Sequence, residues 1–223
     1  LTMEEAASIP IVGVTAWQAL IERAHLKRGE KVLIHAGAGG VGTFAIQLAK
    51  HIGATVATTT SAANVDLVRR LGADVVIDYR AEDFADTLRD YDVVLNSLDA
   101  VTLGKSLRVL RPGGRLISIS GPPDPAFARS LDLPWILKTT LGAIMSVLSY
   151  GIRAKARRRG VSYSFLFMRA DGGQLASIAS LVDNGAIRPV IDRVFPFART
   201  KEALAYVEEG RTKGKVVVSM GAR

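Results

Sequence analysis

The chain has 223 residues, a net charge of +8 and no cysteine. This length allows one well-buried domain, and 48% hydrophobic with 22% charged residues are typical of a globular protein, which excludes predominant disorder. The lack of cysteine excludes disulfides, thiolate nucleophiles, iron–sulfur clusters and cysteine-ligated zinc, and together with the lack of a secretory pattern near Leu1 it favours a cytoplasmic, reducing location.

The first 28 residues read as helical, with Pro10 starting or kinking a helix that carries residues 15–24. From Lys31 onward, short β-branched runs alternate with helical stretches, which is the pattern of parallel strands joined by crossover helices. We therefore predict one domain over residues 1–223, of class α/β, with a doubly wound parallel sheet and helices on both of its faces. The predicted strands cover residues 31–36, 55–60, 74–77, 92–96, 115–119, 190–194 and 216–219. The predicted helices between them include residues 43–51, 62–71, 174–184 and 201–210.

A glycine-rich loop joins the first predicted strand to the first crossover helix. It reads Gly37, Ala38, Gly39, Gly40, Val41, Gly42. Glycines at these places allow a tight turn, the approach of a pyrophosphate without a Cβ in its way, and close packing of helix on strand. The helix N-terminus then offers free N–H groups to phosphate oxygens. This unit predicts a Rossmann fold that binds a nicotinamide dinucleotide; a tight turn without a ligand is the alternative.

The end of the second predicted strand indicates which dinucleotide is bound. It reads Thr58-Thr59-Thr60-Ser61 and lacks the carboxylate that holds the ribose 2′-OH of NAD. Ser61 and Asn64 are small hydrogen-bonding residues that suit a 2′-phosphate, so NADP(H) is the predicted cofactor. An N-cap role for Ser61 is compatible with this function. The candidate charge partners of the phosphate are Arg69, Arg70 and Arg80.

An apolar and basic helical segment is predicted as an insertion at about residues 125–160. Its most apolar part, residues 131–150, is interrupted by Asp132, Pro134 and Lys138, and the remainder is shorter than the roughly 20 residues that span a bilayer. We therefore expect no transmembrane segment. A helix that packs on the domain or on a second subunit is the prediction, and interfacial membrane binding is the alternative.

A basic run follows this apolar stretch. It contains Arg153, Lys155, Arg157, Arg158 and Arg159. No helix-turn-helix, zinc-finger or RNA-binding aromatic motif accompanies the run, so we do not expect a nucleic-acid partner. A solvated helix face is the predicted role, with an anionic ligand or lipid as the alternative.

Residues 29–50 closely resemble the signature of the quinone oxidoreductases, the zeta-crystallin branch of the medium-chain dehydrogenases/reductases. Residues 6–20, 71–80, 110–115, 187–191 and 214–218 are similar to further landmarks of that family. The resemblance implies that Ser61 and Tyr79 lie beside the 2′-phosphate, and that Asn96, Ser120 and Gly121 approach the ribose and nicotinamide. It also implies that the backbone over residues 165–167 meets the nicotinamide carboxamide. For Tyr79 and Phe167 an ordinary core aromatic is the alternative.

The predicted cofactor-binding set is thus Gly37, Ala38, Gly39, Gly40, Val41, Gly42, Thr60, Ser61, Asn64, Tyr79, Asn96, Ser120, Gly121, Phe165 and Phe167. We predict no metal ligand, because cysteine is absent and His25, His35 and His51 do not cluster with carboxylates. No catalytic residue is predicted, since a core or interface role fits Tyr163 better than proton donation does.

The activity that the resemblance implies is zinc-independent hydride transfer from NADPH to a small acceptor, a quinone or an enone. Family members carry a GroES-like catalytic domain before this region, and we expect it to be absent from this chain. The alternatives are a cofactor-binding fragment without turnover of its own and an enoyl reductase-type domain. Pairing of two copies through a sheet edge, as a homodimer, is a further expectation.

Overall fold

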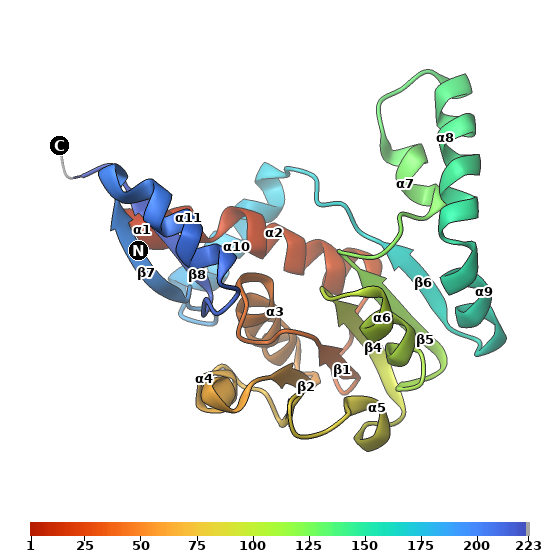
Figure 1. Ribbon diagram of the computed structural model, residues 1–223, viewed down its shortest axis with the longest axis horizontal. Helices are drawn as coiled ribbons and strands as arrows, with labels where there is room; N and C mark the ends of the chain where they lie inside the picture. The colour runs from red at the N-terminus through yellow and green to blue at the C-terminus, as the bar shows by residue number, and fades with distance from the viewer. Residues whose placement is uncertain (222–223) are drawn as a thin grey trace.

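The computed structural model describes residues 1–221 and contains a six-stranded parallel sheet in the order β3-β2-β1-β4-β5-β6 (Figure 1). β1 lies inside the sheet, paired with β2 on one side and with β4 on the other. The chain therefore builds the sheet outward from β1 in one direction and then in the other, which is the doubly wound topology that was predicted. The strands are β1 (Lys31–Ile34), β2 (Thr55–Thr60), β3 (Val75–Asp78), β4 (Tyr91–Asn96), β5 (Leu110–Ser118) and β6 (Ser162–Phe165).

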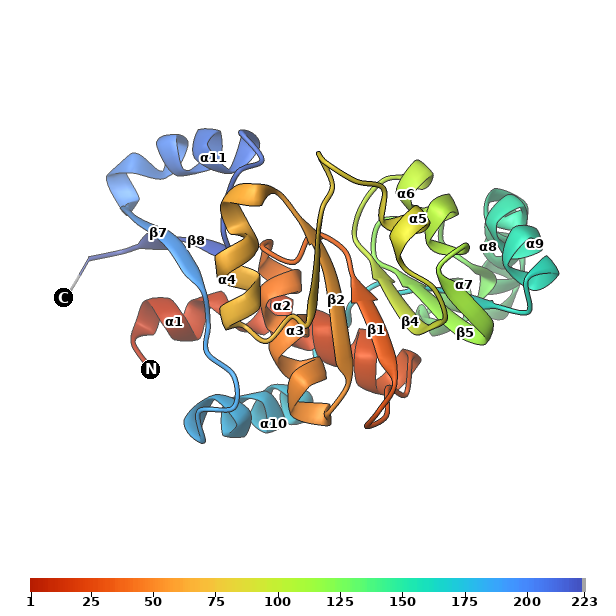
Figure 2. The same ribbon diagram turned by 90° about the horizontal axis from the view of Figure 1, so that it is seen from below.

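Helices cover both faces of this sheet. Alternate residues of a strand point to opposite sides, so each strand contributes side chains to two separate cores. In β1, Val32 and Ile34 belong to one hydrophobic core and Leu33 to the other. The two cores are completed by different helices, as Figure 2 shows from below. The first core takes residues from α2 (Pro10–Trp17), α3 (Gly40–Ile52), α4 (Val65–Arg70) and α10 (Gly172–Asp183). The second takes residues from α5 (Phe84–Thr87), α6 (Ala100–Ser106) and α9 (Tyr150–Arg158). The predicted fold class is confirmed.

The N-terminal helices follow the sequence signals closely. α1 (Met3–Ser8) begins with a capping box between Thr2 and Glu5. Pro10 occupies the first turn of α2, where its missing N–H has no partner to lose, so the prediction that Pro10 starts a helix is confirmed. α2 continues as a π-helical turn, η1 (Gln18–Arg23).

The last two strands form a sheet of their own. β7 (Ile191–Pro196) and β8 (Lys215–Ser219) pair in parallel, joined by η3 (Phe197–Arg199) and α11 (Thr200–Glu208). The sequence shows them as part of one alternating series, whereas the structure separates them from the six-stranded sheet (Figure 1). The link between the sheets is a bridge between Gly39 and Gly214, in which the Gly214 N–H donates to the Ala38 carbonyl over 2.8 Å.

Three helices lie between β5 and β6: α7 (Pro125–Ser130), α8 (Trp135–Leu148) and α9. α8 contacts chiefly α7 and α9, and Met145 is its one buried residue, so α8 packs on the domain mainly through these two helices. Packing on a second subunit stays a prediction. No individual helix within residues 1–221 has both the length and the apolar character to cross a bilayer. β6, which follows, was not among the predicted strands.

Candidate functional site

The glycine loop turns the chain from the end of β1 into α3. Ala36 adopts a positive φ of 52°, and the Gly39 N–H donates to the Ala36 carbonyl over 2.9 Å. Gly39 is extended, with φ −78° and ψ 173°, and serves as the N-cap residue of α3. The first N–H groups of α3 are therefore presented at the end of the loop, as a phosphate-binding helix N-terminus requires.

The glycines of this loop are required for different physical reasons. A Cβ on Gly37 would lie 2.0 Å from Thr58 Oγ1, and a Cβ on Gly42 would lie 2.2 Å from the Ala36 carbonyl oxygen. Both glycines are needed for close packing of the loop, β2 and α3. A Cβ on Gly39 meets only the Ala36 oxygen, at 3.3 Å, and Gly39 lines the large cleft described below. Gly39 is thus the glycine that leaves room for a ligand.

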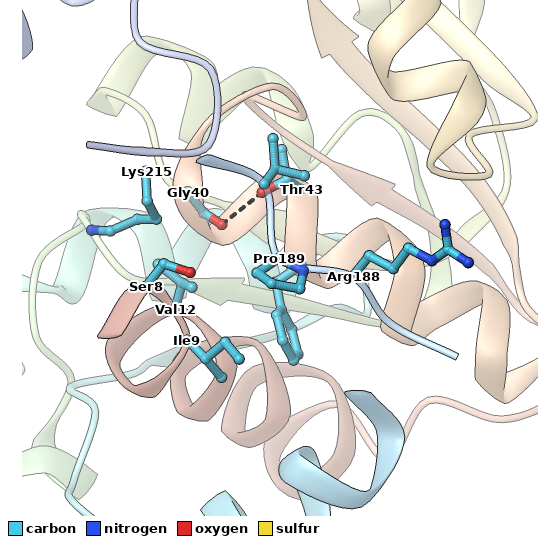
Figure 3. A pocket seen from close by; sticks show the side chains of 10 residues that line it. Ser8, Ile9, Val12, Gly40, Thr43, Arg188, Pro189 and Lys215 are labelled. Carbon is cyan, nitrogen blue, oxygen red and sulfur yellow. Dashed lines mark hydrogen bonds between the residues drawn. The ribbon is translucent and has the colours of Figure 1, made fainter. Parts of the chain in front are cut away.

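Gly40 packs on the opposite side of the loop (Figure 3). There it lines a cavity of about 10 Å³ with Val12 and Lys215, which is room for about one water. A Cβ on Gly40 would lie 2.9 Å from Lys215 Cδ, and Thr43 Oγ1 donates to the Gly40 carbonyl over 3.0 Å. The Gly40 side of the loop is therefore a packing surface, although its N–H belongs to the α3 N-terminus.

A cleft of about 1250 Å³ opens at the carboxyl ends of the strands, where the sheet changes its direction of growth. This is the place where doubly wound sheets bind ligands. Its walls come from the glycine loop, the end of β2, the loops after β3 and β4, and the segment before β8. Six of the predicted cofactor residues line it: Ala38, Gly39, Thr60, Ser61, Asn64 and Tyr79.

The corner of the cleft next to β2 carries the predicted 2′-phosphate residues. Asn64 Nδ2 donates to Ser61 Oγ over 3.3 Å, while Asn64 Oδ1 is buried and has no hydrogen-bond partner. Ser61 is the N-cap residue of η2 (Ala62–Asn64), but its side chain makes no capping bond. Arg80 lines the same corner, with its guanidinium 5.8 Å from the centre of the Tyr79 ring, whereas Arg69 does not line the cleft.

Asn96, Ser120 and Gly121 come together at the ends of β4 and β5. The buried Asn96 side chain donates through Nδ2 to the Leu98 carbonyl over 3.2 Å and to Ser118 Oγ over 3.3 Å. Asn96 Oδ1 has no partner. The Gly121 N–H donates to Ser118 Oγ over 2.9 Å. A buried amide oxygen without a donor is costly, and a ligand hydroxyl or amide group can supply that donor.

Tyr163 is held by its neighbours. Its hydroxyl donates to the Pro122 carbonyl over 2.6 Å, and a Cβ on Gly121 would lie 2.8 Å from that hydroxyl. Burial and, secondarily, the Asp124 carboxylate raise the pKa of Tyr163 far above its usual value. A hydroxyl with a raised pKa and a fixed acceptor suits a structural role better than proton transfer.

The segment after Tyr163 is only partly available to a ligand. The Phe165 N–H donates to Asp124 Oδ2 over 2.9 Å, and the Leu166 N–H donates to the Ser118 carbonyl over 2.8 Å. Phe167 is 67% exposed and Tyr79 is 57% exposed, so neither is an ordinary core aromatic. The Phe167 ring lies 5.4 Å from that of Phe127.

Sequence reasoning missed one wall of the cleft. It consists of Gly210, Arg211, Thr212 and Lys213. Gly210 and Gly214 have φ values of 68° and 72°, so two glycines in the left-handed region flank a turn that carries two cations. The Gly-Arg-Thr-Lys-Gly pattern was the available signal, but only the bridge to the glycine loop shows where it lies.

His35 also lines the cleft, and it is buried. Its Nδ1 lies 3.1 Å from Thr59 Oγ1 and its Nε2 lies 2.9 Å from Ser106 Oγ. Burial lowers the pKa of His35 to about 4, against an opposing effect of Asp99. The ring is therefore neutral at pH 7 and links β1 to β2 and α6.

A six-stranded sheet of this order, with a glycine loop and a cleft at its switch point, defines a Rossmann domain built for a dinucleotide. The chain belongs to the zinc-binding dehydrogenase family, whose model matches residues 71–218.

Curated relatives and solved structures agree with this membership. The chain is 38% identical to NAD(P)H oxidoreductase RTN4IP1, mitochondrial, of Danio rerio, over 99% of this chain and 58% of that protein. It is 31% identical to the chloroplastic NADPH-dependent alkenal/one oxidoreductase of Arabidopsis thaliana, over 96% and 46% of the two chains. The structure of the quinone oxidoreductase from Coxiella burnetii superposes with a TM-score of 0.82 and 31% identity, over 99% and 62%. The chain spans about half the length of these curated relatives.

The family description mentions zinc, but the donor set of this chain does not fit that metal. The sequence contains no cysteine, and residues 1–221 bring together no group of three or more histidines and carboxylates that could hold an ion. Tetrahedral zinc sites need such a set. No chemical step is therefore assigned to a metal.

Proposed function

We propose that this chain is the cofactor-binding part of an NADPH-dependent oxidoreductase that reduces a small conjugated carbonyl compound, a quinone or an enone. Support comes from the relatives, which are named as a quinone oxidoreductase and an alkenal/one oxidoreductase. The observation that carries the proposal is the cleft, which combines a helix N-terminus with a carboxylate-free, hydroxyl-rich end of β2.

Each part of the dinucleotide has candidate partners in this chain. The N–H groups at the start of α3 would hold the pyrophosphate, and Ser61, Asn64 and Arg80 would hold the 2′-phosphate. The unpartnered Oδ1 of Asn96 would accept a hydrogen bond from the ribose or the nicotinamide amide. When bound, the cofactor supplies the hydride, and the protein contributes orientation.

A calorimetric titration of the chain with NADPH and with NADH tests cofactor choice. We expect tighter binding of NADPH, and we expect Arg80→Ala to weaken NADPH binding about tenfold or more by loss of a charged partner while leaving NADH unchanged. Arg69→Ala is the matched control, since Arg69 does not line the cleft. Equal affinities would reject the 2′-phosphate site, and no binding of either would reject the function.

Three further properties belong to the proposal. Oxidation of NADPH by quinones or enones should be insensitive to a zinc chelator, because the chain lacks a zinc donor set. Two copies would pair through β6, one of the two edge strands of the sheet, and sedimentation of the purified chain tests whether a dimer forms. A cytoplasmic location rests on the cysteine-free composition, and imaging of the tagged protein tests it.

A further inference from the structure

Helix α8 presents an apolar face to solvent. Residues 136, 140, 143 and 147 recur at helical spacing, with 137, 144 and 148 beside them, and all except Thr140 are apolar. Each of these positions is exposed, and Val147 is 76% accessible. Trp135 at the start of the helix is 74% accessible. α8 thus exposes an apolar face of the kind that a helix on a globular domain normally buries.

Helix α9, directly after α8, is cationic. The exposed cations at its end are Lys155, Arg157, Arg158 and Arg159. The whole stretch of residues 133–170 contains no aspartate or glutamate. The positive charge next to the apolar face is therefore not balanced by acidic residues of the same segment.

α9 packs on the second core, and α8 packs on α7, so both helices are fixed to the domain. Ala156 is buried and Ile152 packs against the second core, and the Val161 N–H donates to the Ala156 carbonyl over 3.0 Å. Arg153 Nη1 donates to Ser146 Oγ over 3.1 Å and so ties α9 to α8. Figures 1 and 2 both show α8 and α9 at the end of the molecule opposite β7 and β8.

We propose that α8 and α9, the α8–α9 surface, dock the protein on an anionic phospholipid bilayer. Apolar side chains with an exposed tryptophan enter the interface, and adjacent cations pair with lipid phosphates. A second copy of the chain fits less well, because two such surfaces would bring together two sets of unbalanced cations. The helices bend by 63° at their junction, so they do not form one straight span.

Co-sedimentation of the purified chain with vesicles tests this proposal. We expect binding to phosphatidylcholine vesicles that contain phosphatidylglycerol and much weaker binding to phosphatidylcholine alone. Binding should also shift tryptophan emission to shorter wavelength, and Trp135→Phe should remove the shift because the second tryptophan, Trp17, lies on α2 against the first core. Equal binding to both kinds of vesicle, or none, would overturn the proposal.

Charge and apolar variants separate the two contributions. Each exposed cation contributes about fivefold to partitioning, so Arg157→Gln with Arg158→Gln should weaken binding about 25-fold. The matched control, Arg69→Gln with Arg70→Gln, removes two exposed cations from α4, away from this surface, and should leave binding unchanged.

Trp135→Ser with Val147→Ser should abolish binding, and both positions are exposed, so folding is retained. If those serines instead dissolve a dimer formed without lipid, a second copy is the occupant and the proposal fails.

Discussion

At the scale of single residues, two glycines of the same loop should respond in opposite ways when each is changed to alanine. Gly42→Ala puts a methyl 2.2 Å from the Ala36 oxygen and 2.7 Å from Gly37 Cα, both backbone atoms that cannot swing aside. We expect the free energy of unfolding to fall by about 3 kcal/mol. Gly39→Ala keeps φ −78° and ψ 173°, which alanine adopts freely, so its stability should change by less than about 1 kcal/mol.

The effects of the two substitutions on NADPH binding should have the opposite order to their effects on stability. The Gly39 methyl would occupy the cleft where the pyrophosphate is proposed, so Gly39→Ala should weaken NADPH binding about tenfold or more. Urea unfolding and NADPH titration of both variants are the measurements. A stable Gly42→Ala, or a Gly39→Ala that binds normally, would contradict the assignment of one glycine to packing and the other to the ligand.

His35 makes the stability of the fold depend on pH. Its pKa is about 4 in the folded chain and 6.5 ordinarily, so the unfolded chain takes up the proton first as the pH falls. The stability from the neutral ring is complete above pH 6.5 and is lost between pH 6.5 and about 4. The loss should reach about 3 kcal/mol, at 1.36 kcal/mol per pKa unit.

Urea unfolding across this pH range measures the effect. His35→Asn should be less stable at pH 7, because Thr59 and Ser106 lose their partner, yet its stability should decline less steeply toward pH 4. The exposed His51, changed to Gln, serves as the control and should keep the wild-type slope. A wild-type slope in His35→Asn would assign the pH dependence to other groups.

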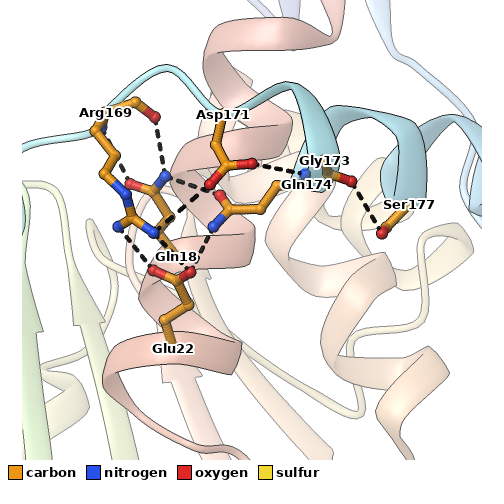
Figure 4. Close-up of polar contacts among 7 residues, drawn as sticks. All are labelled: Gln18, Glu22, Arg169, Asp171, Gly173, Gln174 and Ser177. Carbon is orange, nitrogen blue, oxygen red and sulfur yellow. Dashed lines mark hydrogen bonds and ion pairs between the residues drawn. The ribbon is translucent and has the colours of Figure 1, made fainter.

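At the scale of elements, a buried amide joins the N-terminal helices to α10 (Figure 4). Gln18 Nε2 donates to the Arg169 carbonyl over 2.9 Å and to Gln174 Oε1 over 2.8 Å. Gln18 Oε1 accepts the Arg169 N–H over 3.2 Å, and Glu22 pairs with the Arg169 guanidinium over two contacts of 2.9 Å. This network holds η1 against the segment that leads from β6 to α10.

Gln18→Glu should destabilise the fold strongly. The new carboxylate would face two acceptors, the Arg169 carbonyl and Gln174 Oε1, in a fully buried place near Glu22. We expect a loss of about 3 kcal/mol at pH 7, which recedes at lower pH as the carboxyl takes up a proton. Thermal unfolding at several pH values measures this loss.

The control for that substitution is Gln47→Glu. Gln47 makes similar bonds, with Nε2 donating to the Thr43 and Arg188 carbonyls and Oε1 accepting the Arg188 N–H, but it is half-buried. Water can solvate a carboxylate there, so the loss should be smaller. Equal losses at both positions would show that burial of Gln18 is not the cause.

The elements that the sequence predicts are those whose signals are local. The apolar run of β1, the glycine loop and Pro10 each act through neighbouring residues, and the structure confirms them. β6 escaped prediction because Ser162–Phe165 is four residues long and contains no β-branched residue, and its strand conformation comes from pairing with β5. α8 was predicted as a helix, but the direction of its apolar face depends on tertiary contacts.

At the scale of the whole molecule, the cleft could be predicted only in part. The 2′-phosphate corner follows from the end of β2, which lies close to the glycine loop in the sequence as well as in space. Arg211 and Lys213 lie about 170 positions beyond that loop, and they reach the cleft because β8 starts beside it. Contacts at such separation leave no periodic signal in one sequence.

This arrangement predicts how a bound dinucleotide changes the dynamics of the two sheets. NADPH would contact both the 2′-phosphate corner of the cleft and residues 210–213. It should therefore stabilise the two-stranded sheet of β7 and β8 through the Gly39–Gly214 bridge. At a concentration about 100 times its dissociation constant, NADPH adds at most about 2.7 kcal/mol to the stability of the folded chain, which slows amide exchange up to about 100-fold.

Hydrogen exchange with and without NADPH should show this slowing in residues 61–64 and 210–214. α8 lies at the far end of the molecule and is the internal control, with unchanged exchange (Figure 2). Protection confined to residues 61–64 would mean that the second sheet takes no part in binding.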